Sequence, residues 1–510
     1  VIGRWDGERI VPPEQDYGAR PPVDPPPIKP RRQLYTVTAR GGVRKVSEPS
    51  ARGPQPVRRG EPSLARSSRT MAIASAVSRL TGFLRQIAIT AAIGILAIGN
   101  AYNTANYLPN TIYELLIGGV LTSVVVPLLV HAQRHDGDDG EAYAQRLLSL
   151  TAVLVTIATV VAVVAAPLLI RLFGLSGHGE VRVGTILARL LLPEIIFYGI
   201  GALFGAILNT RGVFGPPMWT PVLNNLVVIA TAVIFFVMPG PHTLTINNMT
   251  NSQIYLLGIG TTLGIIVQAC GLWPYMRRIG FRWKWRFDLR GTGLKADSTL
   301  LLWVVGYVAV SLVGLVTITH LSNAAGTHPG VLGYGAYSNV SLVFQMPYGI
   351  VGVALLTALL PRMSRAAAAG NIRSLIDDLS LGSRLTAVAL IPVTAAFIVL
   401  GPAIMVTIFA HGRTSVGSAH DTGIALAWAA FGLFPYAMTL LQLRAFYAVK
   451  DARTPTLINL GMVVVRVAMS LLVPVLLPDR HVVAGLAFVN SFSFLVGLFL
   501  GDVLLRRRFG

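Results

Sequence analysis

The sequence predicts an all-α polytopic membrane protein with two six-helix bundles around a central cavity, on three observations. First, 53% of its 510 residues are hydrophobic and only 13% are charged, which is too apolar for a water-soluble protein of this length. Second, the chain after residue 70 breaks into long apolar runs separated by short polar loops. Third, two short motifs recur at one fixed offset, which indicates an internal duplication.

The apolar runs set the number of expected helices. A bilayer core takes about 20 apolar residues per helix, and a β-barrel would instead show alternating hydrophobicity. Twelve runs have the helical character, at residues 71–97, 101–130, 147–172, 183–208, 218–238, 254–276, 298–320, 332–361, 380–409, 422–447, 455–477 and 482–505. We therefore expect twelve membrane-spanning helices.

Lysines and arginines are distributed unevenly between the loops. With a cytoplasmic N-terminus, the cytoplasmic loops carry 18 of them and the opposite loops carry four, namely Arg171, Arg182, Arg413 and Arg480. Because positive loops are retained in the cytoplasm, this asymmetry predicts a cytoplasmic N-terminus. The net charge of +20 is located mainly in these loops and in the first 70 residues, so we expect contacts with anionic membrane lipids and not with nucleic acid.

The chain divides by composition into a tail and two bundles. The tail is rich in proline, arginine, glycine and serine without periodicity, which is typical of disorder. We expect a disordered basic cytoplasmic tail at 1–70, an N-terminal six-helix bundle at 71–280, a basic cytoplasmic linker at 281–297 and a C-terminal helix bundle at 298–510. The start at Val1 and the stop at Gly510 directly after a helix predict that both ends are cuts in a longer protein, with the C-terminal bundle truncated.

The internal repeat relates the two bundles. "GVLTSVVVP" ends at Pro127 and "GVALLTALLP" at Pro361, while "TPVLNN" begins at Thr220 and "TPTLIN" at Thr454, so both pairs are 234 residues apart. Each pair is displaced by six helices, and because six is even both halves enter the membrane in the same sense. This predicts a parallel repeat with a pseudo-twofold axis along the membrane normal, as in transporters whose halves rock around a central cavity.

Two arginines lie deep in the first predicted helix. At 1.5 Å per residue, Arg79 and Arg85 are about 12 and 21 Å from its start, and a buried arginine costs about 2.5 to 3.5 kcal/mol. A guanidinium fork matches phosphate oxygens, so we expect these arginines to face a cavity that takes a phosphate. The alternative is a pair of structural salt bridges with Glu114 and Glu194, and these two carboxylates are also candidates to bind Na⁺ or a proton.

Motifs of catalysis and metal binding are absent from the sequence. All nine histidines lie in loops or at predicted helix ends, and no P-loop, nucleophile elbow or HExxH motif occurs. The single cysteine, Cys270, excludes an internal disulfide. We therefore expect no enzyme activity and no cofactor, with movement driven by an ion gradient, the membrane potential or a partner.

Several segments together resemble a known family. They are "SRLTGFLRQ", "LPN" followed by "GGVLTSVVVP", "GAILNTRGVFGPP", "MPYGIVGVALLTALLPRMS" and "FYAVKDARTPTLIN", within about residues 70 to 505. They resemble the MurJ (MviN) lipid II flippases of the multidrug/oligosaccharidyl-lipid/polysaccharide exporter superfamily. The resemblance implies export of lipid II, an undecaprenyl diphosphate carrying a disaccharide-peptide, across the bacterial plasma membrane by alternating access, with Arg79 and Arg85 on the diphosphate.

The sequence departs from the family at other cavity positions. Where relatives have an aspartate before the "LPN" segment this chain has Asn100, and where they have an arginine after it the chain has Tyr113. Leu342 replaces a cavity arginine, and Arg466 is a candidate to compensate for it. The expected cavity residues are therefore Glu114, Glu194, Asn100, Tyr113 and Arg466, in addition to the two arginines of the first helix.

The resemblance also implies features beyond this chain. The family fold has fourteen helices, of which twelve are seen here, and the excess of arginine over lysine indicates a high-GC, actinobacterial source. In actinobacterial relatives a kinase-like domain follows the helices and recruits a phosphopeptide-binding partner, and cell-wall synthesis proteins are further expected partners. Two alternatives remain: an exporter of another polyprenyl-linked glycan or of drugs, and a non-transporting scaffold for cell-wall synthesis.

Overall fold

The computed structural model describes residues 35–37, 43–45, 64–118, 125–135, 137–239, 244–288, 298–449 and 451–509. The chain divides into two units, Val1–Pro62 and Ser63–Gly510. In the first unit, strands β1 (Tyr35–Val37) and β2 (Val43–Lys45) pair in antiparallel fashion. Most of the tail predicted to be disordered lies outside the described residues, and its last part, from Leu64, already belongs to the first helix.

The described part of the second unit is helical, which confirms the predicted fold class. Its first half contains α1 (Leu64–Ile93), α2 (Ala97–Tyr113), the π-helix η1 (Glu114–Gly118), α3 (Val126–His135), α4 (Glu141–Leu172), α5 (His178–Leu191), α6 (Glu194–Thr210), α7 (Gly215–Val237), α8 (Asn251–Cys270) and α9 (Trp273–Arg278). Its second half contains α10 (Ser298–Ala325), α11 (Tyr334–Ala368), α12 (Ile372–Phe409), α13 (Val416–Ala430), α14 (Leu433–Ala448), α15 (Arg453–Leu476), the short 3₁₀-helix η3 (Asp479–His481) and α16 (Val482–Phe509).

The described residues confirm most of the twelve predicted apolar spans. In the described ranges, eight helices are long and apolar enough to cross a membrane, or nine if α13 and α14, bent by 50° against each other, form one span. The other predicted spans coincide with α1, with the interrupted run from α2 to α3, and with α11. The run from α2 to α3 is interrupted by residues outside the described ranges, and for all three segments the spanning of the membrane remains a prediction.

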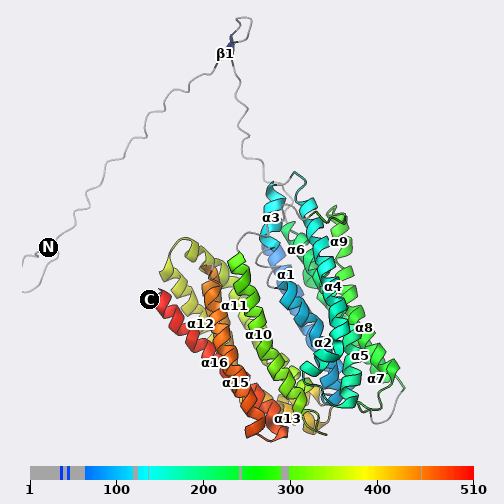
Figure 1. The fold of residues 1–510 in the computed structure, drawn as a ribbon. Coiled ribbons are helices and arrows are strands. Elements are labelled where there is room, and N and C mark those ends of the chain that lie inside the picture. Colours follow the sequence, from blue (N-terminus) through cyan, green and yellow to red (C-terminus); the bar gives the residue numbers. More distant parts are fainter. Residues whose placement is uncertain are drawn as a thin grey trace, which may run out of the picture. The chain divides into compact units, whose positions relative to one another are not determined.

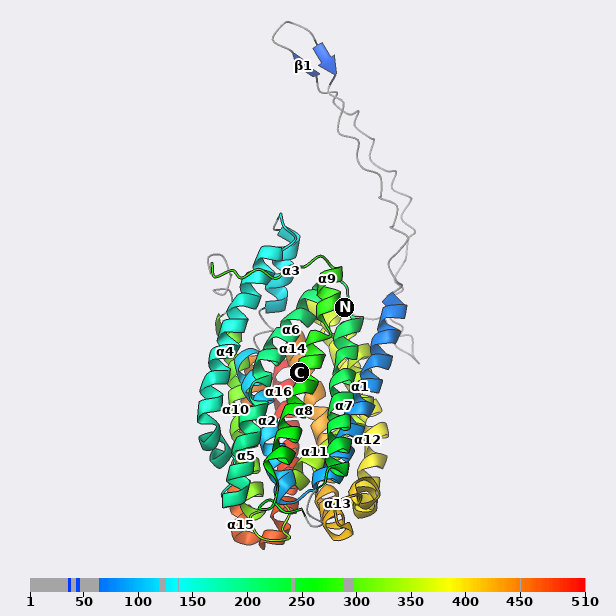
Figure 2. The ribbon, with the colours of Figure 1, turned by 90° about the vertical axis from the view of Figure 1, so that its right-hand side faces the viewer.

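Helix neighbours recur in the two halves. Helix α7 packs against α1 and α8, and α15 packs in the same way against α10 and α16; Figure 2 shows α1, α7 and α8 side by side. The duplicated motif explains part of this pairing, because Asn225 donates a hydrogen bond to the Ser78 carbonyl of α1 (3.1 Å) and Asn459, 234 residues later, donates one to the Tyr307 carbonyl of α10 (3.0 Å). A pseudo-twofold axis between the halves remains a prediction.

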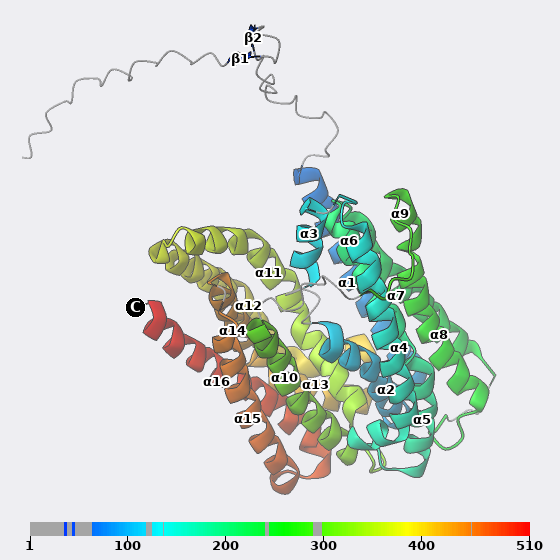
Figure 3. The ribbon, with the colours of Figure 1, turned by 45° about the horizontal axis from the view of Figure 1, so that its top comes forward.

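Hydrophobic cores lie mostly within one half or the other. One cluster of buried side chains runs from Ile89 to Phe281, and two others lie between Ile318 and Leu505, joined by Ile95 from the first half. Figure 1 shows the two groups of helices, blue to green and green to red, coming together near α13 and standing farther apart near α3, and Figure 3 shows the same arrangement from another side. The division into bundles at 281–297 remains a prediction, because residues 289–297 lie outside the described ranges.

Candidate functional site

A cavity of about 450 Å³ lies between the two halves of the helical unit. Its walls come from α1 and α2 on one side and from α10, α11, α14, α15 and α16 on the other. This volume is within the range of roughly 300 to 1,000 Å³ that is typical of ligand sites. The cavity is therefore large enough for a charged head group, and a ligand in it would contact both halves.

Two arginines line the cavity, one from each half. Arg85 comes from α1 and Arg466 from α15, and both side chains are half-buried. Arg466 is held in place by Ser493, whose Oγ accepts hydrogen bonds from Nε (3.2 Å) and Nη2 (2.9 Å), and by the ring of Phe494, 5.5 Å from the guanidinium carbon. In the described part of the chain no carboxylate lies within 4.0 Å of either guanidinium, so both charges are available to an anion.

The rest of the wall is uncharged and mostly polar, with five apolar side chains, Leu315, Ile318, Leu342, Phe344 and Phe494. It includes asparagine, serine, glutamine and tyrosine side chains, at Gln86, Asn103, Asn106, Tyr107, Tyr334, Tyr337, Ser338, Ser341, Gln345, Tyr436 and Asn490. Our reading of the sequence missed these residues. Their spacing could have revealed them, because Tyr334, Tyr337, Ser338, Ser341 and Gln345 stand at positions i, i+3, i+4, i+7 and i+11 and so share one face of a helix. Such a wall offers hydrogen bonds to a ligand rich in hydroxyl and amide groups.

Arg79 does not share this cavity with Arg85, contrary to the sequence prediction. Its side chain is exposed, and its guanidinium lies against Gly349 of α11, where an added Cβ would collide with Nη1. The six residues between the two arginines correspond to about 600° of helix rotation, which leaves the side chains about 120° apart. Arg79 therefore contacts the second half nearer the beginning of α1, outside the lining of the cavity.

The predicted salt bridges of the two carboxylates are not formed. Glu194 is 1% exposed; its Oε1 accepts a hydrogen bond from the Thr262 hydroxyl (3.3 Å), and its Oε2 has no partner in the described part of the molecule. Glu114 is exposed at the start of η1. Neither residue lies within 4.0 Å of a described arginine, and neither lines the cavity.

Tyr113 and Asn100 were predicted to line the cavity but lie elsewhere, whereas Leu342 lines it as predicted. Tyr113 stacks on Tyr198, with ring centroids 5.8 Å apart, and lines a separate pocket of about 260 Å³ inside the first half. Asn100 is fully buried, and its Oδ1 accepts a hydrogen bond from the backbone N–H of Gly335 (2.9 Å). Leu342, which replaces a family arginine, does line the cavity.

Hydrogen bonds between the halves gather at one end of the cavity, where α1 ends and α11 begins. Asn339 accepts a hydrogen bond from Gln86 Nε2 (2.8 Å), and Asn323 Nδ2 donates to Thr104 Oγ1 (2.8 Å) and to the carbonyl of Phe173 (2.8 Å). We call the four side chains Gln86, Asn100, Asn323 and Asn339 the amide clasp. The backbone N–H of Arg413, just before α13, adds a bond to the carbonyl of Ala91 (2.9 Å). The clasp therefore holds the two halves together at this end.

Solved structures of membrane transporters share this architecture. The structure titled "Lipid II flippase MurJ, inward closed conformation" matches with a TM-score of 0.69 at 19% identity, over 86% of this chain and 87% of that one. An inward-facing multidrug resistance MATE family transporter of the MOP superfamily matches with a TM-score of 0.60 at 16% identity, over 86% and 98% of the two chains. The chain thus has the fold of this class of transporter.

The family follows from the sequence comparisons. The family model described as "Lipid II flippase MurJ" matches residues 89–510, and the chain belongs to this family, as the resemblance predicted. A probable lipid II flippase MurJ of Haemophilus influenzae is 26% identical over 444 residues, 83% of this chain and 82% of its own length. The lipid II flippase MurJ of Burkholderia cenocepacia is 26% identical over 402 residues, 76% and 74% of the two chains. The family is named for transport and not for an enzymatic reaction, while an actinobacterial source remains a prediction.

Proposed function

We propose that this protein moves lipid II from the inner to the outer leaflet of the plasma membrane, with the diphosphate held between Arg85 and Arg466. The observation that carries the proposal is that these arginines line one cavity from opposite halves, with no described carboxylate within 4.0 Å of either. Two guanidinium forks match the oxygens of a diphosphate, and charge-assisted hydrogen bonds are the stronger kind. An anion between them draws the two halves together.

The remaining parts of lipid II fit the surroundings of the arginines. The sugars and the peptide carry hydroxyl and amide groups, which match the uncharged polar wall formed by α2 and α11. The polyprenyl chain is apolar and stays in the lipid phase. An exporter of cationic drugs is expected to have an acidic cavity wall, whereas the residues that line this cavity include two arginines and no aspartate or glutamate, so we favour the phosphate-bearing cargo.

The predicted orientation of the chain in the membrane indicates which side the closed end of the cavity faces. If the N-terminus is cytoplasmic, as the loop charges predict, α1 begins on the cytoplasmic side and ends on the outer side. The amide clasp then lies on the outer side, and the structure represents the state that is closed to the outside. Arg79, nearer the beginning of α1, lies where an incoming diphosphate passes first, and we assign it to entry of the cargo instead of to the central site.

Glu194 is our candidate for the group that couples transport to an ion gradient. Glu194 combines complete burial with one oxygen that lacks a partner in the described chain, so it remains our candidate for a coupling proton or Na⁺. The membrane potential is the alternative. Contacts with cell-wall synthesis proteins, and with a phosphopeptide-binding partner through a C-terminal region, are predictions that rest on the resemblance alone.

Binding of a fluorescent short-chain lipid II to the purified full-length chain tests the proposal. Each charged hydrogen bond contributes about 1.5 to 3 kcal/mol, so Arg85→Ala and Arg466→Ala are each expected to weaken binding by about 10- to 150-fold. Arg189→Ala is the matched control, because Arg189 is an exposed arginine of α5 outside the cavity lining. Equal affinity of all three variants and the wild type would reject the site, and the absence of binding to the wild type would favour another cargo or a scaffold.

A further inference from the structure

A second charged pocket lies at the outer end of the molecule, away from the cavity. It has a volume of about 580 Å³ and is formed by the end of α4, the start of α5 and the end of α10. Arg171 and Arg182, two of the four arginines in loops predicted to lie outside, both line it. Translocation disfavours positive residues in such loops. Two of these arginines in one pocket therefore indicate a functional site.

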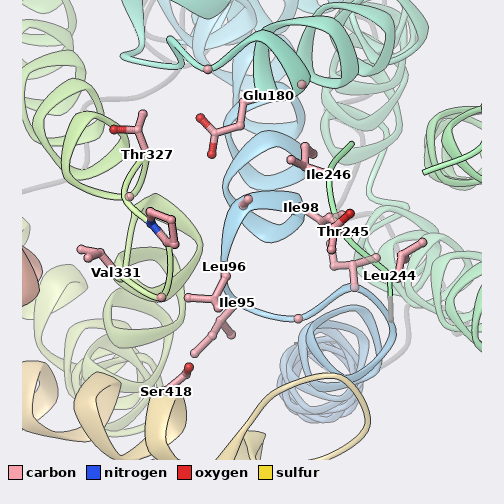
Figure 4. A pocket seen from close by; sticks show the side chains of 18 of the residues that line it. Ile95, Leu96, Ile98, Glu180, Leu244, Thr245, Ile246, Thr327, Val331 and Ser418 are labelled. Carbon is pink, nitrogen blue, oxygen red and sulfur yellow. The ribbon is translucent and has the colours of Figure 1, made fainter. Parts of the chain in front are cut away.

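The pocket presents positive charge without a carboxylate in its lining. Arg182 Nη2 donates to Asn251 Oδ1 (2.9 Å), and no described carboxylate lies within 4.0 Å of Arg171 or Arg182. Glu180, in the first turn of α5, belongs to the neighbouring pocket of about 540 Å³. Figure 4 shows its carboxylate directed into that pocket, between the loops that carry Thr327 and Ile246. Both guanidiniums therefore keep donors for an anion.

Two histidines, His178 and His320, also line this pocket. Nδ1 of His320, on α10, lies 2.8 Å from the carbonyl oxygen of Leu172, so Nδ1 carries the proton and donates it, and Nε2 has no partner in the described part of the chain. His178 begins α5, whose N-cap Gly177 makes no side-chain capping bond. The Glu180 carboxylate accepts a hydrogen bond from the backbone of Gly177 at the start of α5, so the positive charge of the pocket comes from the two arginines. Since Arg171 and His320 come from different halves, an anion here contacts both.

An apolar surface leads directly to this pocket. Val160, Val164, Leu168 and Leu172 of α4 follow one another every four residues and are 58, 75, 70 and 51% exposed. Residues four apart share one face of a helix, so these side chains form a continuous stripe. In a membrane-spanning helix such a stripe faces acyl chains, and it ends next to Arg171. A charged head group attached to an acyl chain fits this combination.

We propose that this pocket binds the phosphate of an anionic phospholipid, with an acyl chain along the exposed face of α4. Arg171 and Arg182 hold the phosphate from the first half, and His320 contacts it from the second. The lipid is distinct from the cargo, because the cavity with Arg85 and Arg466 has a separate lining. By bridging the halves beside the amide clasp, the lipid stabilises the state that is closed at this end.

Native mass spectrometry of the full-length chain with phosphatidylglycerol tests this site. We expect the wild type to retain phosphatidylglycerol at least 5-fold more strongly than Arg171→Ala or Arg182→Ala, and phosphatidylcholine to show no such difference. Arg480→Ala removes another arginine of the outer loops that is not part of the pocket, and it should bind as the wild type does. Arg171→Lys, which keeps the charge, should retain most of the binding, and circular dichroism verifies that each variant is folded.

Three results would overturn the proposal. The first is equal loss in Arg480→Ala, which would indicate attraction to surface charge in general. The second is displacement of the lipid by millimolar inorganic phosphate, which would make the pocket a site for soluble anions. The third is unchanged binding in folded Arg171→Ala and Arg182→Ala. None of these outcomes depends on transport of lipid II, so this proposal and the proposed function fail independently.

Discussion

Removing one side chain of the amide clasp should open the end of the cavity that the clasp closes, which is the outer end in the proposed orientation. Asn323 is fully buried and donates two hydrogen bonds of 2.8 Å, to Thr104 on α2 and to the Phe173 carbonyl after α4. In Asn323→Leu both bonds are lost at nearly constant volume. Two interhelical hydrogen bonds contribute about 1 to 3 kcal/mol together. We therefore expect the equilibrium between the closed and open outer end to shift by about 5- to 150-fold.

Thiol accessibility measures this shift. In a Cys270→Ala background, Ser341→Cys places a single thiol in the cavity lining, and an impermeant maleimide is added from the outside. As long as the open state is the minor one, the labelling rate is proportional to its population, so Asn323→Leu should raise the rate by the same factor.

Asn225→Leu is the matched control for this experiment. Asn225 also donates two hydrogen bonds, to the Ser78 carbonyl and to Thr81 Oγ1, but it joins α7 to α1 within one half. Its loss should lower stability without changing the labelling rate from outside. If Asn323→Leu labels no faster than Asn225→Leu at matched folding, the clasp does not hold the outer end closed.

Three further predictions follow from the same contacts. Ser493→Ala removes the acceptor that orients Arg466 and should weaken lipid II binding by about 2- to 10-fold; an unchanged affinity would contradict this role. Leu342→Arg in the Arg466→Ala background returns a cation to the cavity and should restore part of the binding; no recovery in the folded variant would contradict this. Gly174→Ala should lower the melting temperature more than Gly280→Ala, because both have positive φ but only Gly174 lies against the His320 backbone.

The class of fold was predictable because it depends on composition and periodicity over long stretches. The exact spans were less predictable, since α1 and α2 combine apolar residues with arginine, glutamine and asparagine side chains of the cavity. The repeat was detectable through "TPVLNN" and "TPTLIN", because Asn225 and Asn459 bind the backbone of equivalent helices. Because this hydrogen bond requires an asparagine at the same position of both motifs, the repeat can be detected in the sequence.

The composition of the site was predicted only in part. Arg85 and Arg466 were identified because charge is conspicuous in an apolar helix, and both line the cavity. Arg79 was grouped with Arg85 although the helical rotation separates them by about 120°. Asn100 was expected in the cavity and lies buried against Gly335, because the sequence does not show which neighbouring helix an asparagine meets. Contacts between the halves arise from tertiary packing, which a single sequence does not encode locally.

Translocation of lipid II in proteoliposomes is the most direct test of the central claim. The full-length chain and its variants Arg85→Ala, Arg466→Ala and Arg189→Ala are reconstituted at matched, folded levels, and the transport rate into the opposite leaflet is compared. If the diphosphate crosses the membrane between the two cavity arginines, the first two variants lose at least about 10-fold in rate and Arg189→Ala transports like the wild type. Wild-type rates in Arg85→Ala and Arg466→Ala would contradict the account.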